Sequence, residues 1–217
     1  MISLFTVSTC VLANNPIITP SQSCVFSGTF QQNKSLAGLP TAVRSSGTFF
    51  YHCKVGVIWK TVAPIEETLV LNRDGDSYQV KDGLTTSLAS RQGRLLGELI
   101  NSLIGRDQLF ISEHFDVSEI AVDSAGDAAR SGVLLTPKEN RIKRVFKRIE
   151  LIQPAPDAAA EADQVTISML DRNEQWTRIE STKLADFGDH SDAIEHCFDQ
   201  HAITAAECKL LQAVSSP

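Results

Sequence analysis

Residues 25–64 constrain the fold more than any other part of the chain. Phe26 and Phe30 stand on one face of an extended segment with polar residues between them, and Val57 and Trp59 stand two positions apart. Side chains of a β-strand point alternately to its two faces, so this spacing predicts antiparallel strands with one apolar and one wet face. Such a sheet has to bury its apolar face, and an amphipathic helix further along the chain is the expected cover.

The remainder of the chain continues the strand pattern around one helix. Asp74-Gly75 tolerates the backbone angles of a hairpin turn. Leucines and isoleucines at helical spacing predict a helix over 91–104, which Gly105 can end. Residues 110–122 are expected to be irregular with some strand, and 121–132 and 154–163 to be loops. Further strands are predicted at 68–72, 77–80, 133–136, 145–152, 165–169 and 176–182.

Composition limits the class of protein. The chain has 217 residues, of which 42% are hydrophobic, so it can bury a sizeable core, and we take it as one domain. A net charge of −6 argues against a nucleic-acid partner, because such proteins need a basic surface to displace counterions from phosphates. No run of 18 apolar residues occurs, so no membrane-spanning segment is predicted.

The first residues have two interpretations. Residues 2–13 are apolar enough for a signal-peptide core and end in a small-residue cleavage pattern, but no Lys or Arg precedes them. Leu4, Val7 and Val11 share one helical face and Ser3 can cap it, which favours a mature helix that follows an already removed signal. Both interpretations stay open at this point.

Cysteine spacing is most informative near the C-terminus. The five cysteines are Cys10, Cys24, Cys53, Cys197 and Cys208. Residues 191–200 predict a short helix, and Thr204 followed by Glu207 is a capping-box pattern that begins a second one. Cys197 and Cys208 would face each other across this helical hairpin, which suits a disulfide. The pairing of the other three is left open.

Zinc binding is the alternative for this segment. His190, His196 and His201 could ligate a metal together with Cys197 and Cys208. A helix surface with a disulfide is the preferred interpretation, so no metal and no cofactor is predicted.

Catalytic signals are weak. Residues 186–188 spell the Asp-Phe-Gly magnesium motif of kinases, but no glycine-rich loop accompanies it. Ser112, His114 and Asp116 alternate on a predicted strand, and nothing places them as a triad. No catalytic residue is predicted.

One basic run stands out in this acidic chain. It consists of Lys138, Arg141, Lys143, Arg144, Lys147 and Arg148. A solvated face is the simplest interpretation. The other is docking on anionic lipid or on an acidic partner through Lys143, Arg144 and Lys147.

Several motifs occur in an order that resembles a known family. They are F-S-G-T-F-Q at 26–31, S-G-T-F at 46–49, V-I-W at 57–59 followed by Pro64, L-L-T-P-K at 134–138 and I-E-L at 149–151. Over residues 2–185 this order resembles the periplasmic outer-membrane lipoprotein carrier (LolA-like) family, and more closely its divergent members encoded beside polyene-lipid and fatty-acid-like biosynthetic genes. Residues 186–217 lie outside the family pattern, and we expect them to form a helical hairpin packed on the same domain.

The resemblance implies a mainly β fold with helices: a curved, unclosed antiparallel half-barrel whose concave apolar face is covered by helices and receives an acyl chain. It implies a periplasmic carrier without enzymatic activity that moves a lipid or lipoprotein toward the outer membrane. Its partners would be an inner-membrane donor and an outer-membrane acceptor, with transient contact to the membrane surface. The Arg-Pro that precedes the aromatic strand in classical members is replaced here by Cys53-Lys54-Val55.

Cargo contacts are expected from apolar side chains of the sheet and helix, which could equally form an ordinary core. These residues are Phe26, Phe30, Phe49, Val57, Trp59, Leu69, Leu96, Leu99, Ile100, Leu103, Ile149, Ile167 and Met169. An apolar cavity would favour the carrier over the alternative, an interaction module of a lipid or polyene export system that has no cavity. A serine or cysteine bonded to histidine at its mouth would instead indicate a lipid-ester hydrolase.

Overall fold

The computed structural model describes residues 18, 21, 23–74, 76–88, 91–122, 130–154, 164–189, 193–197 and 202–212. The strands are β1 (Val25–Lys34), β2 (Val43–His52), β3 (Gly56–Ala63), β4 (Glu67–Asn72), β5 (Tyr78–Lys81), β6 (Leu84–Ser87), β7 (Phe115–Ile120), β8 (Arg130–Pro137), β9 (Phe146–Pro154), β10 (Gln164–Asp171) and β11 (Trp176–Gly188). The helices are α1 (Arg91–Gly105), α2 (Gln108–His114), α3 (Asn140–Lys143), the 3-10 helix η1 (Ala193–Cys197) and α4 (Ala205–Gln212).

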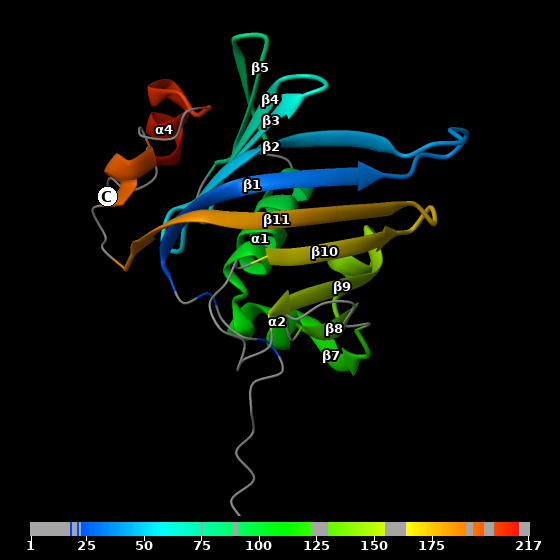
Figure 1. Ribbon diagram of the computed structural model, residues 1–217. Helices are drawn as coiled ribbons and strands as arrows, with labels where there is room; N and C mark the ends of the chain where they lie inside the picture. The colour runs from blue at the N-terminus through cyan, green and yellow to red at the C-terminus, as the bar shows by residue number, and fades with distance from the viewer. Residues whose placement is uncertain are drawn as a thin grey trace, which may run out of the picture.

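All eleven strands belong to one antiparallel sheet (Figure 1). Two meanders, β1 to β6 and β7 to β11, join where β1 pairs with β11. The edge strands β6 and β7 are not paired with each other, so the sheet stays open. Figure 1 shows it curving around α1, which confirms the predicted unclosed half-barrel with helices.

Both faces of the central strands are buried, and β2 shows how. Phe49 and Tyr51 belong to the inner core, which α1 covers with Leu99 and Leu103. Phe50, between them in sequence, points to the opposite face and joins a second core. Alternation therefore sends neighbouring aromatic residues to two different cores.

The second core lies under the C-terminal helices. α4 packs on β3 and β4, outside the curve of the sheet (Figure 1). Ile203 and Leu211 contact the outward side chains of the sheet in this cluster, as does Cys197, which the structure joins to Cys208 in a disulfide. A second disulfide links Cys24 to Cys53 at the paired ends of β1 and β2.

The predicted capping box is confirmed at the start of α4. The Thr204 amide donates to Glu207 Oε2 (2.6 Å), and the Glu207 amide donates to Thr204 Oγ1 (3.3 Å). The same carboxylate also reaches the sheet. It accepts a hydrogen bond from the Thr68 hydroxyl (2.5 Å) and lies 3.3 Å from Lys60 Nζ, and all three of these side chains are buried.

Helix α1 ends at Gly105, as predicted, and the residue with left-handed backbone angles is Arg106 (φ 51°). A Cβ on Gly105 would lie 2.0 Å from the hydroxyl oxygen of Tyr51. Glycine is therefore required by the close approach of the buried Tyr51 ring rather than by the helix cap.

The prediction for residues 110–122 was wrong in its first half. Residues up to His114 form α2, which begins after Asp107, whose carboxylate caps the Phe110 amide (3.1 Å). Ser112 and His114 are thus helical, and only Asp116 lies on a strand. A two-residue turn at Asp82 and Gly83 (φ 51° and 75°) adds the hairpin of β5 and β6, which was not predicted.

Some expectations lie outside the described residues. These are the N-terminal helix or signal remnant at 2–13, Cys10, the loops at 123–129 and 155–163, His190 and His201.

Candidate ligand-binding cavity

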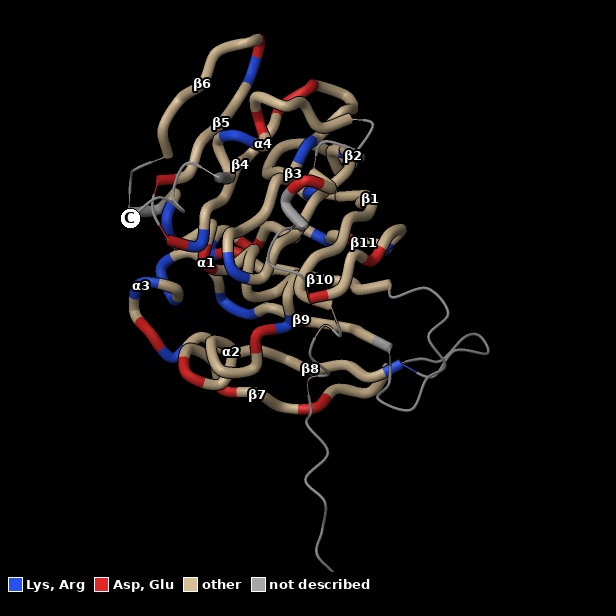
Figure 2. Tube along the Cα trace, turned by 90° about the vertical axis from the view of Figure 1, so that its left-hand side faces the viewer, with Lys and Arg blue, Asp and Glu red and all other residues tan. Residues whose placement is uncertain are grey.

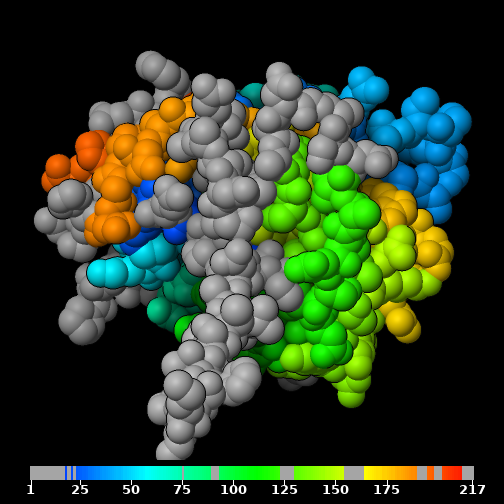
Figure 3. All heavy atoms as spheres, turned by 60° about the horizontal axis from the view of Figure 1, so that its bottom comes forward, coloured from blue at the N-terminus to red at the C-terminus, as the bar shows by residue number. Residues whose placement is uncertain are grey.

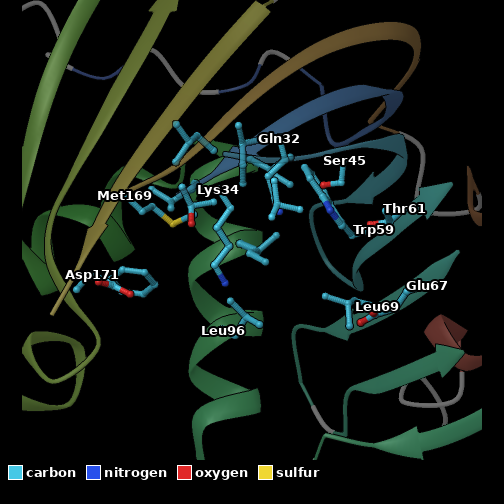
Figure 4. Close-up of a pocket in the computed structure, with 18 of the residues that line it drawn as sticks. Gln32, Lys34, Ser45, Trp59, Thr61, Glu67, Leu69, Leu96, Met169 and Asp171 are labelled. Carbon is cyan, nitrogen blue, oxygen red and sulfur yellow. The ribbon is translucent and has the colours of Figure 1, made fainter. Parts of the chain in front are cut away.

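A cavity of about 640 Å³ lies between the inner face of the sheet and α1 (Figure 4). Its lining comes from seven strands, the β3–β4 turn, α1 and the residue that precedes β9. The lining residues are Gln32, Lys34, Val43, Ser45, Trp59, Thr61, Pro64, Ile65, Glu67, Leu69, Leu96, Ile100, Leu103, Ile104, Val145, Phe146, Ile167, Met169, Asp171, Thr177 and Ile179.

Helix α1 presents two adjacent stripes to the sheet. Leu95 and Leu99 are buried in the inner core. Leu96 and Ile100, one position further round the helix, are only half-buried and line the cavity. A wide apolar face of this kind can pack on a sheet and line a cavity at once.

The predicted cargo residues divide into two groups. Those that line the cavity are Trp59, Leu69, Leu96, Ile100, Leu103, Ile167 and Met169. The others are buried in the inner core: Phe26, Phe30, Phe49, Val57, Leu99 and Ile149. The two groups touch, because Phe30 stacks on Trp59 with ring centroids 3.8 Å apart and Phe49 stacks on it at 5.8 Å.

Polar side chains at one end of the cavity were missed by the sequence analysis. This polar mouth consists of Gln32, Lys34, Ser45, Thr61, Glu67, Asp171 and Thr177. Lys34 is exposed and the others are half-buried. The mouth lies toward the β1–β2 and β10–β11 turns, which project side by side at one edge of the molecule (Figures 1 and 3). Continuing the two-residue period of Phe26 and Phe30 would have placed Gln32 and Lys34 on the same inner face.

The predicted docking residues flank this cavity. Lys143 closes α3, and Val145 and Phe146, just after it, line the cavity. Lys143 and Arg144 are exposed, and within the described part of the chain neither forms an ion pair. Lys147 is paired with Glu174. Figure 2 shows basic residues at α3 and basic and acidic residues mixed along the rest of the trace.

The rest of the basic run is neutralised by nearby carboxylates. Arg141 lies 3.1 Å from Glu98 and 2.5 Å from Glu139. The hydrogen bond from Arg141 is the main reason that the pKa of the Glu139 carboxyl is lowered. Arg148 lies 3.5 Å from Glu150, and its guanidinium carbon lies 5.2 Å from the centre of the Trp176 ring. Arg141 and Arg148 are therefore ion-paired, whereas within the described residues Lys143 and Arg144 are not.

Cysteine and histidine do cluster, but away from the cavity. The sulfurs of Cys24 and Cys53 and a ring nitrogen of His52 lie within 4.8 Å of one another. The two sulfurs are joined in a disulfide, which offers no thiolate to a metal. In the alternative zinc set, Cys197 and Cys208 are likewise joined, and His196 stacks on Phe187 (4.5 Å).

None of the helices in the described ranges is long and apolar enough to cross a membrane. No model of a known protein family matches the chain, and no curated protein matches it.

Solved structures that are similar to it include the following three. A LolA superfamily protein from Nitrosomonas europaea is 12% identical, with a TM-score of 0.42, over 78% of this chain and 90% of that protein. A DUF1329 family protein from Desulfovibrio piger is 13% identical, with a TM-score of 0.43, over 84% and 92%. An outer membrane lipoprotein-sorting protein domain from Vibrio parahaemolyticus is 9% identical, with a TM-score of 0.39, over 87% and 91%.

Two of these descriptions name the family that the order of motifs resembles.

Proposed function

We propose that this protein is a carrier without enzymatic activity that shields an acyl chain of a lipid or lipoprotein from water and moves it toward the outer membrane. The cavity is the observation that supports this most directly. Its volume of about 640 Å³ falls within the range of roughly 300–1,000 Å³ that is typical of small-molecule sites. Its aromatic and aliphatic lining suits a hydrocarbon chain.

The energetics of carriage follow from this lining. Transfer of each methylene from water into an apolar cavity is favourable by about 0.8 kcal/mol, so a chain of moderate length binds without any polar contact. Release then requires that the cavity open. Helix α1 packs on β2, β3 and β4, so a shift of α1 away from β10 and β11 would widen the cavity without unpairing a strand.

Two other functions are less well supported. An interaction module without a cargo site would have no use for the cavity, although its basic segment at Lys143 and Arg144 could still bind a partner. A lipid-ester hydrolase needs a nucleophile activated by a neighbouring base. Ser45 lines the cavity, but the described lining residues include no histidine or cysteine.

A periplasmic location belongs to the same proposal. Disulfides form and persist in oxidising compartments, and the two disulfides of this chain favour such a compartment. In the periplasm the carrier would collect its cargo from an inner-membrane donor and deliver it to an outer-membrane acceptor.

Contact quenching of Trp59 by a brominated fatty acid tests the proposal. Trp59 lines the cavity, and replacing the half-buried Trp176 with phenylalanine leaves it as the sole tryptophan. We expect saturable quenching in the Trp176→Phe protein. Adding Ile100→Asp should weaken binding at least about tenfold, because a carboxylate against the chain costs several kcal/mol unless it is protonated.

The matched control is Leu109→Asp, which makes the same kind of change on α2, where the side chain is 82% exposed and does not line the cavity. Ile100 is a better choice than Leu99, which is 2% exposed, so a charge there would test folding instead. Absence of saturable quenching in the folded parent protein would contradict the carrier proposal. Equal quenching in both aspartate variants would remove α1 from the site.

A further inference from the structure

Five of the seven strands that line the cavity change from apolar to polar along their inward-facing rows, whereas β2 ends in Val43 and β9 contributes Phe146. On β1 the row runs from Phe30 through Gln32 to Lys34, and on β10 from Ile167 through Met169 to Asp171. The inward rows of β3, β4 and β11 also pass from a large apolar residue to a polar one. In every case the polar residue lies at the end toward the turns. The cavity is therefore amphipathic along its length, with an apolar interior and the polar mouth defined above.

Charges at this mouth are not equivalent. Glu67 accepts a hydrogen bond from Gln79 Nε2 (2.7 Å), and Asp171 accepts from the amides of Asn173 (2.7 Å) and Gln175 (2.9 Å). Both carboxylates are thus held by neighbouring groups of the protein. Lys34 is the lining residue with a positive charge, and within the described ranges it forms no ion pair.

Lys34 is placed where the head of a bound amphiphile would lie. Figure 4 shows its side chain extending from β1 over the cavity toward α1, with Glu67 and Asp171 on opposite sides of it. An acyl chain that fills the apolar interior leaves its head group at the polar end. An anionic head at Lys34 meets an ammonium group directly, whereas Glu67 and Asp171 keep their negative charges but already accept hydrogen bonds from the protein.

We propose that the cargo is an acyl amphiphile with an anionic head, a carboxylate or a phosphate, and that Lys34 binds this head. The inference rests on the carrier function proposed above and names its ligand class. Because Lys34 is exposed, its contribution is screened by salt, and the head selects and orients the ligand while the chain supplies most of the affinity.

Three brominated ligands of equal chain length test this in the Trp176→Phe protein: a fatty carboxylate, an alkyl phosphate and a fatty alcohol. We expect both anions to quench Trp59 at concentrations about fivefold lower than the alcohol, a difference of ~1 kcal/mol. Lys34→Gln should remove this preference and Lys34→Arg should keep it. The control Lys209→Gln removes an exposed charge on α4, on the outer side of the sheet, and should leave the preference intact.

The outcomes separate the possibilities. A stronger effect of Lys34→Gln on the carboxylate points to free fatty acids, and a stronger effect on the phosphate points to phospholipid heads. If the alcohol binds as tightly as the anions, or if Lys34→Gln weakens all three ligands equally, Lys34 is not a head-group site and the carrier proposal stands alone. If no ligand quenches Trp59, both proposals fail together.

Discussion

The buried carboxylate of Glu207 should hold the C-terminal helix on the sheet, and Glu207→Gln tests this. Its oxygens accept hydrogen bonds from the Thr204 amide (2.6 Å) and the Thr68 hydroxyl (2.5 Å), and Oε1 lies 3.3 Å from Lys60 Nζ. Glutamine has nearly the same shape but carries no charge and only one acceptor oxygen. The variant therefore removes the ion pair and at least one of the buried hydrogen bonds that the two carboxylate oxygens accept.

We expect Glu207→Gln to lower the free energy of unfolding by about 2–4 kcal/mol. Removing one partner of a buried ion pair costs about 3–5 kcal/mol when the other charge is left unpaired. Lys60 keeps a second partner, Glu66, at 3.0 Å, which reduces that penalty, whereas the lost buried hydrogen bond adds about 1 kcal/mol. The control is Glu66→Gln: that side chain is 71% exposed, and exposed pairs contribute about 0–1 kcal/mol.

The pKa of Glu207 adds a pH signature. Burial alone would raise it, but the hydrogen bonds from Thr204 and Thr68 and the charge of Lys60 together lower it. Because the pKa of Glu207 is lower in the folded protein than in the unfolded chain, the charged carboxylate stabilises the fold at pH values above the ordinary glutamate pKa. This stabilisation disappears as the pH falls through the lowered, folded-state pKa. Wild type and Glu207→Gln should therefore converge in acid, whereas the Glu66→Gln difference should remain small throughout.

Urea denaturation from neutral pH down to about pH 3 measures the global effect. Hydrogen exchange of the α4 amides shows whether the helix detaches before the sheet unfolds. Equal unfolding free energies for Glu207→Gln and Glu66→Gln at neutral pH would refute the reasoning. So would a gap between wild type and Glu207→Gln that is unchanged in acid.

Two further predictions concern the tail and the docking segment. Replacing Cys197 and Cys208 together by alanine should lower the free energy of unfolding, measured by urea denaturation, by about 2–4 kcal/mol, because the disulfide restricts the unfolded chain. Reductant should then have no further effect at this site. A variant as stable as the oxidised parent would contradict this. The double variant Lys143→Glu, Arg144→Glu should reduce co-sedimentation of the protein with anionic vesicles, most strongly at low salt, since exposed charges are screened within about 10 Å at 0.1 M salt. The control Lys209→Glu should not reduce it. Binding that survives the double reversal would show that this segment is only a solvated face.

Local sequence determined most of the secondary structure of this protein. Alternation at Phe26 and Phe30, the leucine spacing of α1, and the Thr204 and Glu207 pair each depend on residues a few positions apart, so they could be predicted without knowing the fold. Helix α2 was not predicted. Its one local signal is the capping residue Asp107, and the seven residues that follow are too few to show a clear helical pattern.

The tertiary structure alone decided which apolar residues surround open space and which charges meet. Nothing local distinguishes Leu99, packed in the inner core, from Leu96, which lines the cavity. Glu207 reaches Lys60 across 147 positions of sequence, and that contact exists only because β3 and α4 share the outer face. Alternation assigns a side chain to a face, but what covers that face depends on segments brought together from distant parts of the chain.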